Sequence, residues 1–126
     1  MIKESKYKAK MKVFNITRQT LLASSVDVAS SSSERRKGLL GRDSLAPREG
    51  LWIVPCESIH TFFMKFSIDI IYLDRSMRVR KVRSNVPPWR LSACPTAHSV
   101  IELASGSIKA SQTKPGDQLE FTAIET

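Results

Sequence analysis

The residues best suited to chemistry lie in the segment HTFFMKFSID, residues 60–69. Asp69 interrupts an apolar run, residues 68–73, which is too short for a helix and rich in β-branched and aromatic side chains. Such a run is typical of a strand covered on both faces. Because an unpartnered buried carboxylate is costly, Asp69 must be hydrogen-bonded or ion-paired, and we expect positive neighbours to gather around it. A functional site is therefore predicted to begin here.

Several polar and cationic side chains are candidates for one binding site at the mouth of the predicted sheet. The candidate ligand-binding residues are Arg42, His60, Thr61, Lys65, Asp69, Trp89 and Arg90. Arginine, lysine and a hydroxyl together suit a carboxylate or a phosphate better than a neutral ligand, and Trp89 beside Arg90 could stack on a planar group. The leading hypothesis is a binding module for a small anionic ligand or an acidic protein segment. The structural alternative is that Lys65 or Arg42 only neutralises Asp69 to hold the fold.

Two cysteines and two histidines repeat one spacing, Cys56-x3-His60 and Cys94-x3-His98. Four such ligands could close a tetrahedral zinc site, but a four-residue step along a strand covers about 13 Å, too far for shared ligation. A second alternative is a thiol enzyme in which a nearby imidazole activates Cys56 and Asp69 orients the base. Separately placed thiols and imidazoles are the simpler interpretation. No metal or cofactor is therefore predicted, and enzymatic activity is left open.

The chain of 126 residues has a formal net charge of +8, and the positive charge is unevenly placed. Five lysines and one glutamate fall in residues 1–12, and six basic residues with no acid fall in residues 75–90. Such a surface attracts polyanions, so a nucleic-acid-binding accessory protein is the alternative function. No apolar run approaches the ~20 residues that span a bilayer, and the basic start lacks the apolar segment of a secretory signal. We expect a cytoplasmic protein with no membrane partner.

The elements that must position these residues are mostly strands. Apolar runs and alternation predict strands within residues 11–16, 21–28, 51–54, 68–73, 77–86, 98–103 and 119–123. Ser31 followed by Glu34 is a capping-box pattern, which predicts a short helix, and Gly41 suits its C-terminal cap. Residues 107–113 suit a single helical turn. A slip in the alternation near Arg80–Lys81 predicts a β-bulge in the strand within residues 77–86.

The predicted fold class is α+β, predominantly β, because strands outnumber helices in this reading. We expect a single compact β-rich sheet or small barrel with one or two short helices. Residues 1–11 are predicted to be a disordered basic tail, and residues 12–126 a single β-rich domain with one core.

Sequence motifs spread along the chain resemble those of a known family. The matching residues are Glu34-Arg35, Gly38-Leu39-Leu40, Arg42, Leu45, Gly50-Leu51, Phe63-Met64-Lys65, Ile68-Asp69-Ile70, Asp74, Pro88, Val100-Ile101-Glu102-Leu103, Gly106 and Gly116-Asp117. In this order and spacing they resemble the widespread prokaryotic family called domain of unknown function 192, over roughly residues 12–124. The chain departs from the commoner family pattern at Phe63, where tryptophan is usual, and at Phe66-Ser67, where Asn-Thr is common. The resemblance implies a β-rich fold with a short helix and implies no activity.

Overall fold

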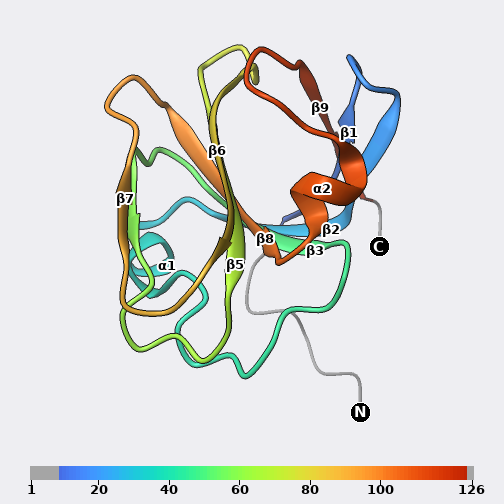
Figure 1. The fold of residues 1–126 in the computed structure, drawn as a ribbon. Helices are drawn as coiled ribbons and strands as arrows, with labels where there is room; N and C mark the ends of the chain where they lie inside the picture. Colours follow the sequence, from blue (N-terminus) through green and yellow to red (C-terminus); the bar gives the residue numbers. More distant parts are fainter. Residues whose placement is uncertain (1–8, 125–126) are drawn as a thin grey trace.

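In the computed structural model, which describes residues 9–124, the chain folds around one curled sheet of seven strands (Figure 1). The elements in chain order are β1 (Lys10–Asn15), β2 (Thr20–Ala29), α1 (Ser32–Lys37), β3 (Glu49–Ile53), β4 (Ser58–His60), β5 (Ile68–Leu73), β6 (Val79–Val86), β7 (Leu91–Ala93), β8 (Ser99–Ala104), α2 (Ser107–Ser111) and β9 (Leu119–Ala123). The strands lie in the order β6-β5-β8-β3-β2-β1-β9, and β4 pairs with β7 in a separate ribbon. The pair β2 and β3 is parallel, and the other pairs are antiparallel. The predicted α+β, predominantly β fold class is confirmed.

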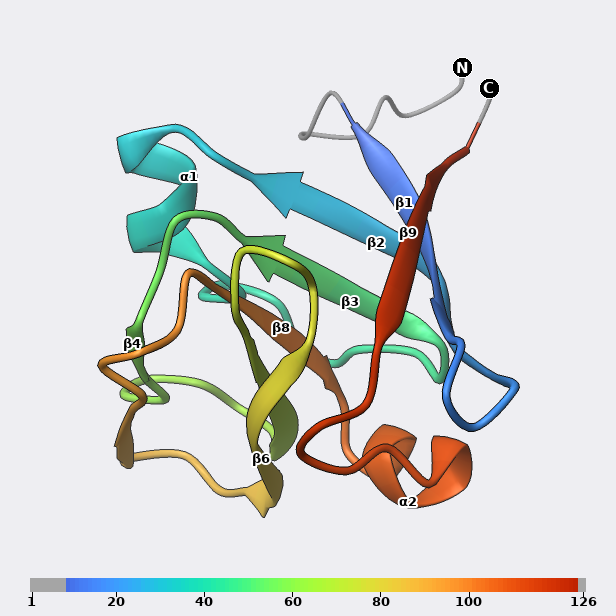
Figure 2. The same cartoon turned by 90° about the horizontal axis from the view of Figure 1, so that it is seen from above.

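The two edge strands of the sheet, β6 and β9, are brought close together by backbone hydrogen bonds between the residues near their starts. The Val79 N–H group donates to the Asp117 carbonyl at 2.8 Å, and the Gly116 N–H group donates to the Val79 carbonyl at 2.8 Å. The Leu119 N–H group donates to the Met77 carbonyl at 3.0 Å. Figure 2 shows the sheet bending from β6 through β8 and β3 to β9. The structure is thus a half-barrel, between the open sheet and the small barrel that the sequence predicts.

Strands β5 and β8 lie inside the sheet and are buried along their whole length. Successive side chains of a strand point to opposite faces, so Ile70 and Tyr72 pack in one core cluster, whereas Ile71 and Leu73 pack in the other. Apolar side chains on both faces explain why the sequence of β5 reads as a nearly continuous apolar run. An acidic side chain in either strand is therefore forced into the interior.

Helix α1 has the predicted capping box but ends earlier than expected. The Ser31 side chain accepts from the Glu34 N–H group at 3.2 Å, and the Glu34 carboxylate accepts from the Ser31 N–H group at 3.0 Å. The helix ends at Gly38, whose φ of +51° is a conformation that favours glycine, so Gly41 as the C-terminal cap is wrong. Within residues 9–124, no helix is long and apolar enough to cross a membrane.

The strand pairing confirms the predicted β-bulge. Tyr72 pairs with Lys81 and Leu73 pairs with Val79, which leaves Arg80 as the inserted residue. Two short strands, β4 and β7, are not predicted by the sequence patterns. Strand β1 begins at Lys10, within the range expected to be a tail, and residues 1–8 of that tail lie outside the residues that the structure describes.

Candidate functional site

Asp69 is fully buried and is hydrogen-bonded entirely by backbone groups in the described part of the chain. Its Oδ1 atom accepts from the Asn85 N–H group at 2.8 Å. Its Oδ2 atom accepts from the N–H groups of Gly106 at 3.1 Å and Ile108 at 2.8 Å. The prediction that the Asp69 carboxyl group is hydrogen-bonded is confirmed. The prediction that cations gather around Asp69 is wrong. Asp69 joins β5 to the end of β6 and to the start of α2, which is a structural role.

The two cations proposed as partners of Asp69 pair with other carboxylates. Arg42 Nη2 lies 3.1 Å from Asp27 Oδ2, and Lys65 Nζ lies 2.9 Å from Asp43 Oδ1. The side chains of Lys65 and Asp43 are 64% and 86% exposed, so this second pair is a surface interaction of little energetic value. The hypothesis that Lys65 or Arg42 neutralises Asp69 is therefore wrong.

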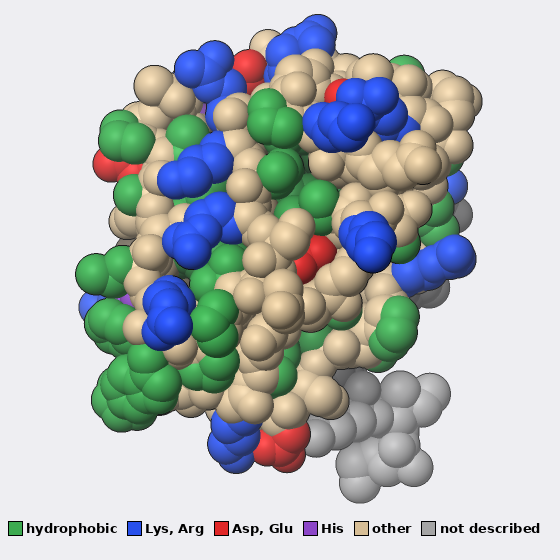
Figure 3. Space-filling view, in the orientation of Figure 1, with side chains coloured by type: hydrophobic (Ala, Val, Ile, Leu, Met, Phe, Trp, Pro, Cys, Tyr) green, Lys and Arg blue, Asp and Glu red, His purple; other side chains and the backbone are tan. Residues whose placement is uncertain are grey.

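Four of the predicted binding residues do lie together, at the end of β4 and on the loops that follow β4 and β6. The Thr61 side chain accepts from the Arg90 N–H group at 2.9 Å, and the Thr61 carbonyl accepts from the Trp89 N–H group at 3.1 Å. The His60 ring stacks on Phe62, with ring centroids 5.0 Å apart. In Figure 3 a column of blue basic side chains leads to a green apolar patch at the lower left of this face. These four residues lie near one another, whereas the hydrogen bonds of Asp69 are to Asn85, Gly106 and Ile108.

The cysteines and histidines do not form the zinc site that the alternative requires. Among the side chains of residues 9–124, no group of three or more His, Cys, Asp or Glu is placed to hold one metal ion. Burial raises the pKa of the Cys56 thiol, and its Sγ donates a hydrogen bond to the Ser58 carbonyl at 3.1 Å. A thiol enzyme needs a lowered cysteine pKa, so this direction argues against Cys56 as a nucleophile.

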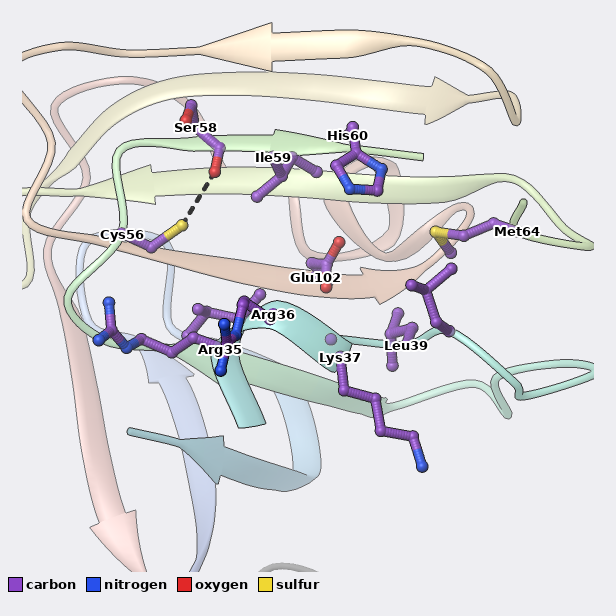
Figure 4. Close-up of a pocket in the computed structure, with 13 residues that line it drawn as sticks. Arg35, Arg36, Lys37, Leu39, Cys56, Ser58, Ile59, His60, Met64 and Glu102 are labelled. Atoms are coloured by element: carbon purple, nitrogen blue, oxygen red, sulfur yellow. Dashed lines mark hydrogen bonds between the residues drawn. The ribbon is translucent and has the colours of Figure 1, made fainter. Parts of the chain in front are cut away.

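A different acidic residue, Glu102 of β8, lies at a cavity of about 210 Å³. Residues 35–40, from α1 and the turn after it, form one side of the cavity. Strand β4 (residues 58–60) and Cys56, which precedes it, form the other side. Ile53, Met64 and Glu102 complete the lining. Figure 4 shows the Glu102 carboxyl group between α1 on one side and Ile59 and His60 on the other. This cavity is the strongest candidate for a functional site.

The position of Glu102 follows from the register of the central strands. On β8 it pairs with Ile70 of β5 and with Leu51 of β3, so apolar strands flank it on both sides. Gly50 allows β3 to approach closely, because a Cβ atom there would lie 2.7 Å from the Glu102 carbonyl oxygen. The Glu102 side chain is therefore carried into the apolar layer beneath α1.

Burial controls the acidity of Glu102. The residue is 3% exposed, and burial raises the pKa of its carboxyl group from 4.5 to about 7, while the Arg42 guanidinium partly opposes the shift. A carboxyl group with this pKa exists in both protonation states near neutral pH. It can therefore donate or accept a hydrogen bond in response to what occupies the cavity.

Arg35 brings a second unusual polar group to the same cavity. Its Nη1 donates to the Pro55 carbonyl at 3.3 Å, but its buried Nε has no hydrogen-bond partner within the described range. Arg35, Cys56 and Glu102 all line this cavity. A donor without a partner and a carboxyl group with a shifted pKa at one cavity are typical of a binding or catalytic site.

Glu102 is the functional candidate that sequence reasoning misses. It occurs in the run VIELA, where Val100 and Ala104 occupy the same face of the strand and Ile101 and Leu103 the other. An acidic residue in phase with apolar residues of a buried strand is the same signal that draws attention to Asp69. The acidic residue Asp69 is explained by its backbone hydrogen bonds, which hold the fold together. The acidic residue Glu102 lies at the cavity.

Comparison with known proteins identifies the family through its sequence. The family model of domain of unknown function 192, described as an uncharacterized ACR, matches residues 13–121. A UPF0127 protein of Pyrococcus horikoshii is 36% identical over 104 residues, which cover 76% of this chain and 86% of the relative. A UPF0127 protein of Thermococcus sibiricus is 30% identical over 122 residues, which cover 90% of this chain and 76% of the relative.

Two crystal structures share the fold at low sequence identity. A Sinorhizobium meliloti protein described as a "putative transcription regulator" has a TM-score of 0.78 and 20% identity, covering 94% of this chain and 98% of that chain. A Novosphingobium aromaticivorans protein of unknown function has a TM-score of 0.73 and 23% identity, covering 95% of this chain and 90% of that chain. These likenesses concern the fold alone. By the family model and the archaeal relatives, this chain belongs to the domain of unknown function 192 family.

Proposed function

We propose that the protein binds a small ligand bearing an anionic group in the Glu102 cavity. The observation that carries the proposal is that Glu102, with a pKa of about 7, and Arg35, whose Nε has no partner in the described part of the chain, line the same cavity. Burying an ionisable carboxyl group, or a donor that has no partner among the described residues, costs free energy, and a ligand that satisfies both groups best explains their retention. Under this proposal the anion site lies beneath α1, and not beside Lys65 and Arg90, where the sequence predicts it.

The chemistry of the lining favours an acceptor-rich, negatively charged ligand. Arg35 and Arg36 of α1 line one side of the cavity, whereas the Lys37 side chain extends away from Glu102 (Figure 4). Arginine binds carboxylates and phosphates with several directed hydrogen bonds, and protonated Glu102 adds a further donor. The cavity volume of about 210 Å³ lies below the ~300–1,000 Å³ of typical drug-sized pockets, so the ligand is a small metabolite or a small group of a larger one.

The proposal predicts that anion binding weakens as the pH rises through about 7. Ionisation of Glu102 places a negative charge in the cavity and removes its proton donor, so an anionic ligand binds best when Glu102 is protonated. Thermal-shift measurements and calorimetry with sulfate, formate and oxalate, which are almost fully ionised at both pH 6 and pH 8, should show stronger binding at pH 6. Arg35→Ala should abolish the effect, and Glu102→Gln should bind equally at both pH values.

Lys65→Ala provides the matched control, because Lys65 is a cation of the originally predicted site that lies in an exposed surface pair. The proposal expects this variant to bind like the wild type. Loss of binding in Lys65→Ala, or full binding in Arg35→Ala, would place the anion site elsewhere. The absence of any effect of sulfate or carboxylates at pH 6 would contradict anion binding in this cavity.

A further inference from the structure

Aromatic side chains gather on the surface at the loops after β4 and β6, away from the interior. Phe63 is 71% exposed and Trp89 is 57% exposed, and their ring centroids lie 4.7 Å apart in an edge-on contact. Phe62 also stacks on Trp89, with ring centroids 5.8 Å apart. We call Phe62, Phe63 and Trp89 the aromatic platform. Large exposed rings in contact with one another are unusual on a protein surface and indicate an interaction site.

The platform is held in place by the backbone of two loops. Thr61 is 1% exposed, and its hydroxyl donates to the Pro87 carbonyl at 2.7 Å. The same hydroxyl accepts from the Arg90 N–H group, which joins the two loops on both sides of Trp89. Phe63 and Trp89 adopt φ values of +66° and +68°, which bulky side chains rarely adopt. Backbone strain of this kind persists where the surrounding structure enforces it, often at functional sites.

A row of cations leads away from the platform along β7. Arg80 donates to the Thr96 hydroxyl at 3.2 Å, Lys81 to the Ala93 carbonyl at 2.8 Å, and Arg83 to the Leu91 carbonyl at 3.3 Å. Arg90 continues the row, since its Nη1 lies 3.4 Å from the carbonyl of Trp89 in the platform. We call Arg80, Lys81, Arg83 and Arg90 the basic row. Within β7 the Leu91 and Ala93 acceptors, two residues apart in extended chain, are separated by about 7 Å.

The local sequence keeps the basic row free of competing negative charge. Residues 75–101 contain no aspartate or glutamate, although they contain all four members of the basic row. Figure 3 shows the result as a column of blue side chains that ends at the green patch. The potential along this column is positive, and the platform at its end offers aromatic faces and edges.

We infer that the platform and the basic row together bind single-stranded nucleic acid, independently of the Glu102 cavity. Unpaired bases stack on aromatic rings, and the phosphates that follow along the strand interact with arginine and lysine. The order of the two features on this surface, rings at one end and cations along one line, matches this recognition mode. A duplex does not match it, because its bases are stacked on one another and cannot reach the rings.

Fluorescence anisotropy with a labelled twelve-nucleotide oligo(dT) and oligo(U), using the full chain, tests the inference. We expect binding at 50 mM salt that weakens about 50-fold by 200 mM salt, as neutralisation of about four phosphates requires. Trp89→Ala should weaken binding by about 5- to 150-fold with an unchanged salt dependence, because it removes a stacking surface. Arg83→Ala should weaken binding and lower the slope of log affinity against log salt by about 0.7.

The control variant is Lys109→Ala, which removes an exposed cation of α2 that lies outside the basic row. It should leave affinity within about twofold of the wild type, and thermal melting should confirm that Trp89→Ala is folded. Full binding in a folded Trp89→Ala variant would overturn the inference, as would preference for duplex over single strands. Binding to vesicles containing phosphatidylserine without binding to either oligonucleotide would also overturn it and identify a membrane surface as the partner.

Discussion

Replacing Asp69 with asparagine is expected to lower the free energy of unfolding by about 3 kcal/mol. The two carboxyl oxygens accept from three backbone N–H groups in a position with no solvent exposure. Asparagine keeps one oxygen and turns an NH2 group toward a donor, so at least one buried N–H group loses its acceptor. Chemical denaturation followed by circular dichroism measures the change.

Asp43→Asn is the matched control for Asp69→Asn. Asp43 is also an aspartate with a close partner, Lys65, but the pair lies on the surface. We expect no measurable loss of stability in this variant. Equal stability of Asp69→Asn and the wild type would mean that the backbone contacts of this carboxyl group do not hold β5, β6 and α2 together.

Replacing Glu102 with glutamine is expected to stabilise the protein at alkaline pH. The folded-state pKa of about 7 lies above the ordinary value of 4.5, so the folded protein holds a proton that the unfolded chain releases between these values. The contribution of Glu102 to stability is therefore complete below pH 4.5 and is lost as the pH rises to about 7. At about 1.4 kcal/mol per pKa unit, the wild type should lose about 2–3 kcal/mol relative to Glu102→Gln between pH 5 and pH 8.

Unfolding free energies of both proteins at pH 5, 6, 7 and 8 measure this difference. Glu120→Gln, at an exposed position of β9, should show a nearly constant difference from the wild type over the same range. A difference between Glu102→Gln and the wild type that does not change with pH would show that Glu102 is not buried as described.

Local sequence signals predict the features of the fold that depend on neighbouring residues. The Ser31 and Glu34 capping box is a contact between residues three apart, and it starts α1 as predicted. The bulge at Arg80 follows from a slip in alternation within one strand. The buried strand β5 is recognised because both of its faces are apolar.

Features that depend on distant residues are not predicted by the sequence. The partners of Asp69 are backbone groups of residues 85, 106 and 108, which carry no side-chain signal. Strands β4 and β7 contain three residues each and pair across more than thirty positions, so no hairpin pattern marks them. The cavity arises because α1 and β4 meet over Glu102, and only the tertiary structure brings these segments together.

The central claim is that Glu102 is a protonatable group in a ligand-binding cavity, and a carbon-13 NMR titration tests it most directly. The side-chain carboxyl signal of Glu102, assigned by its loss in Glu102→Gln, should titrate with a pKa near 7. A saturating anion that binds in the cavity should raise that pKa further, because it disfavours the ionised carboxylate. A signal that titrates near 4.5, with or without anions, would contradict the account.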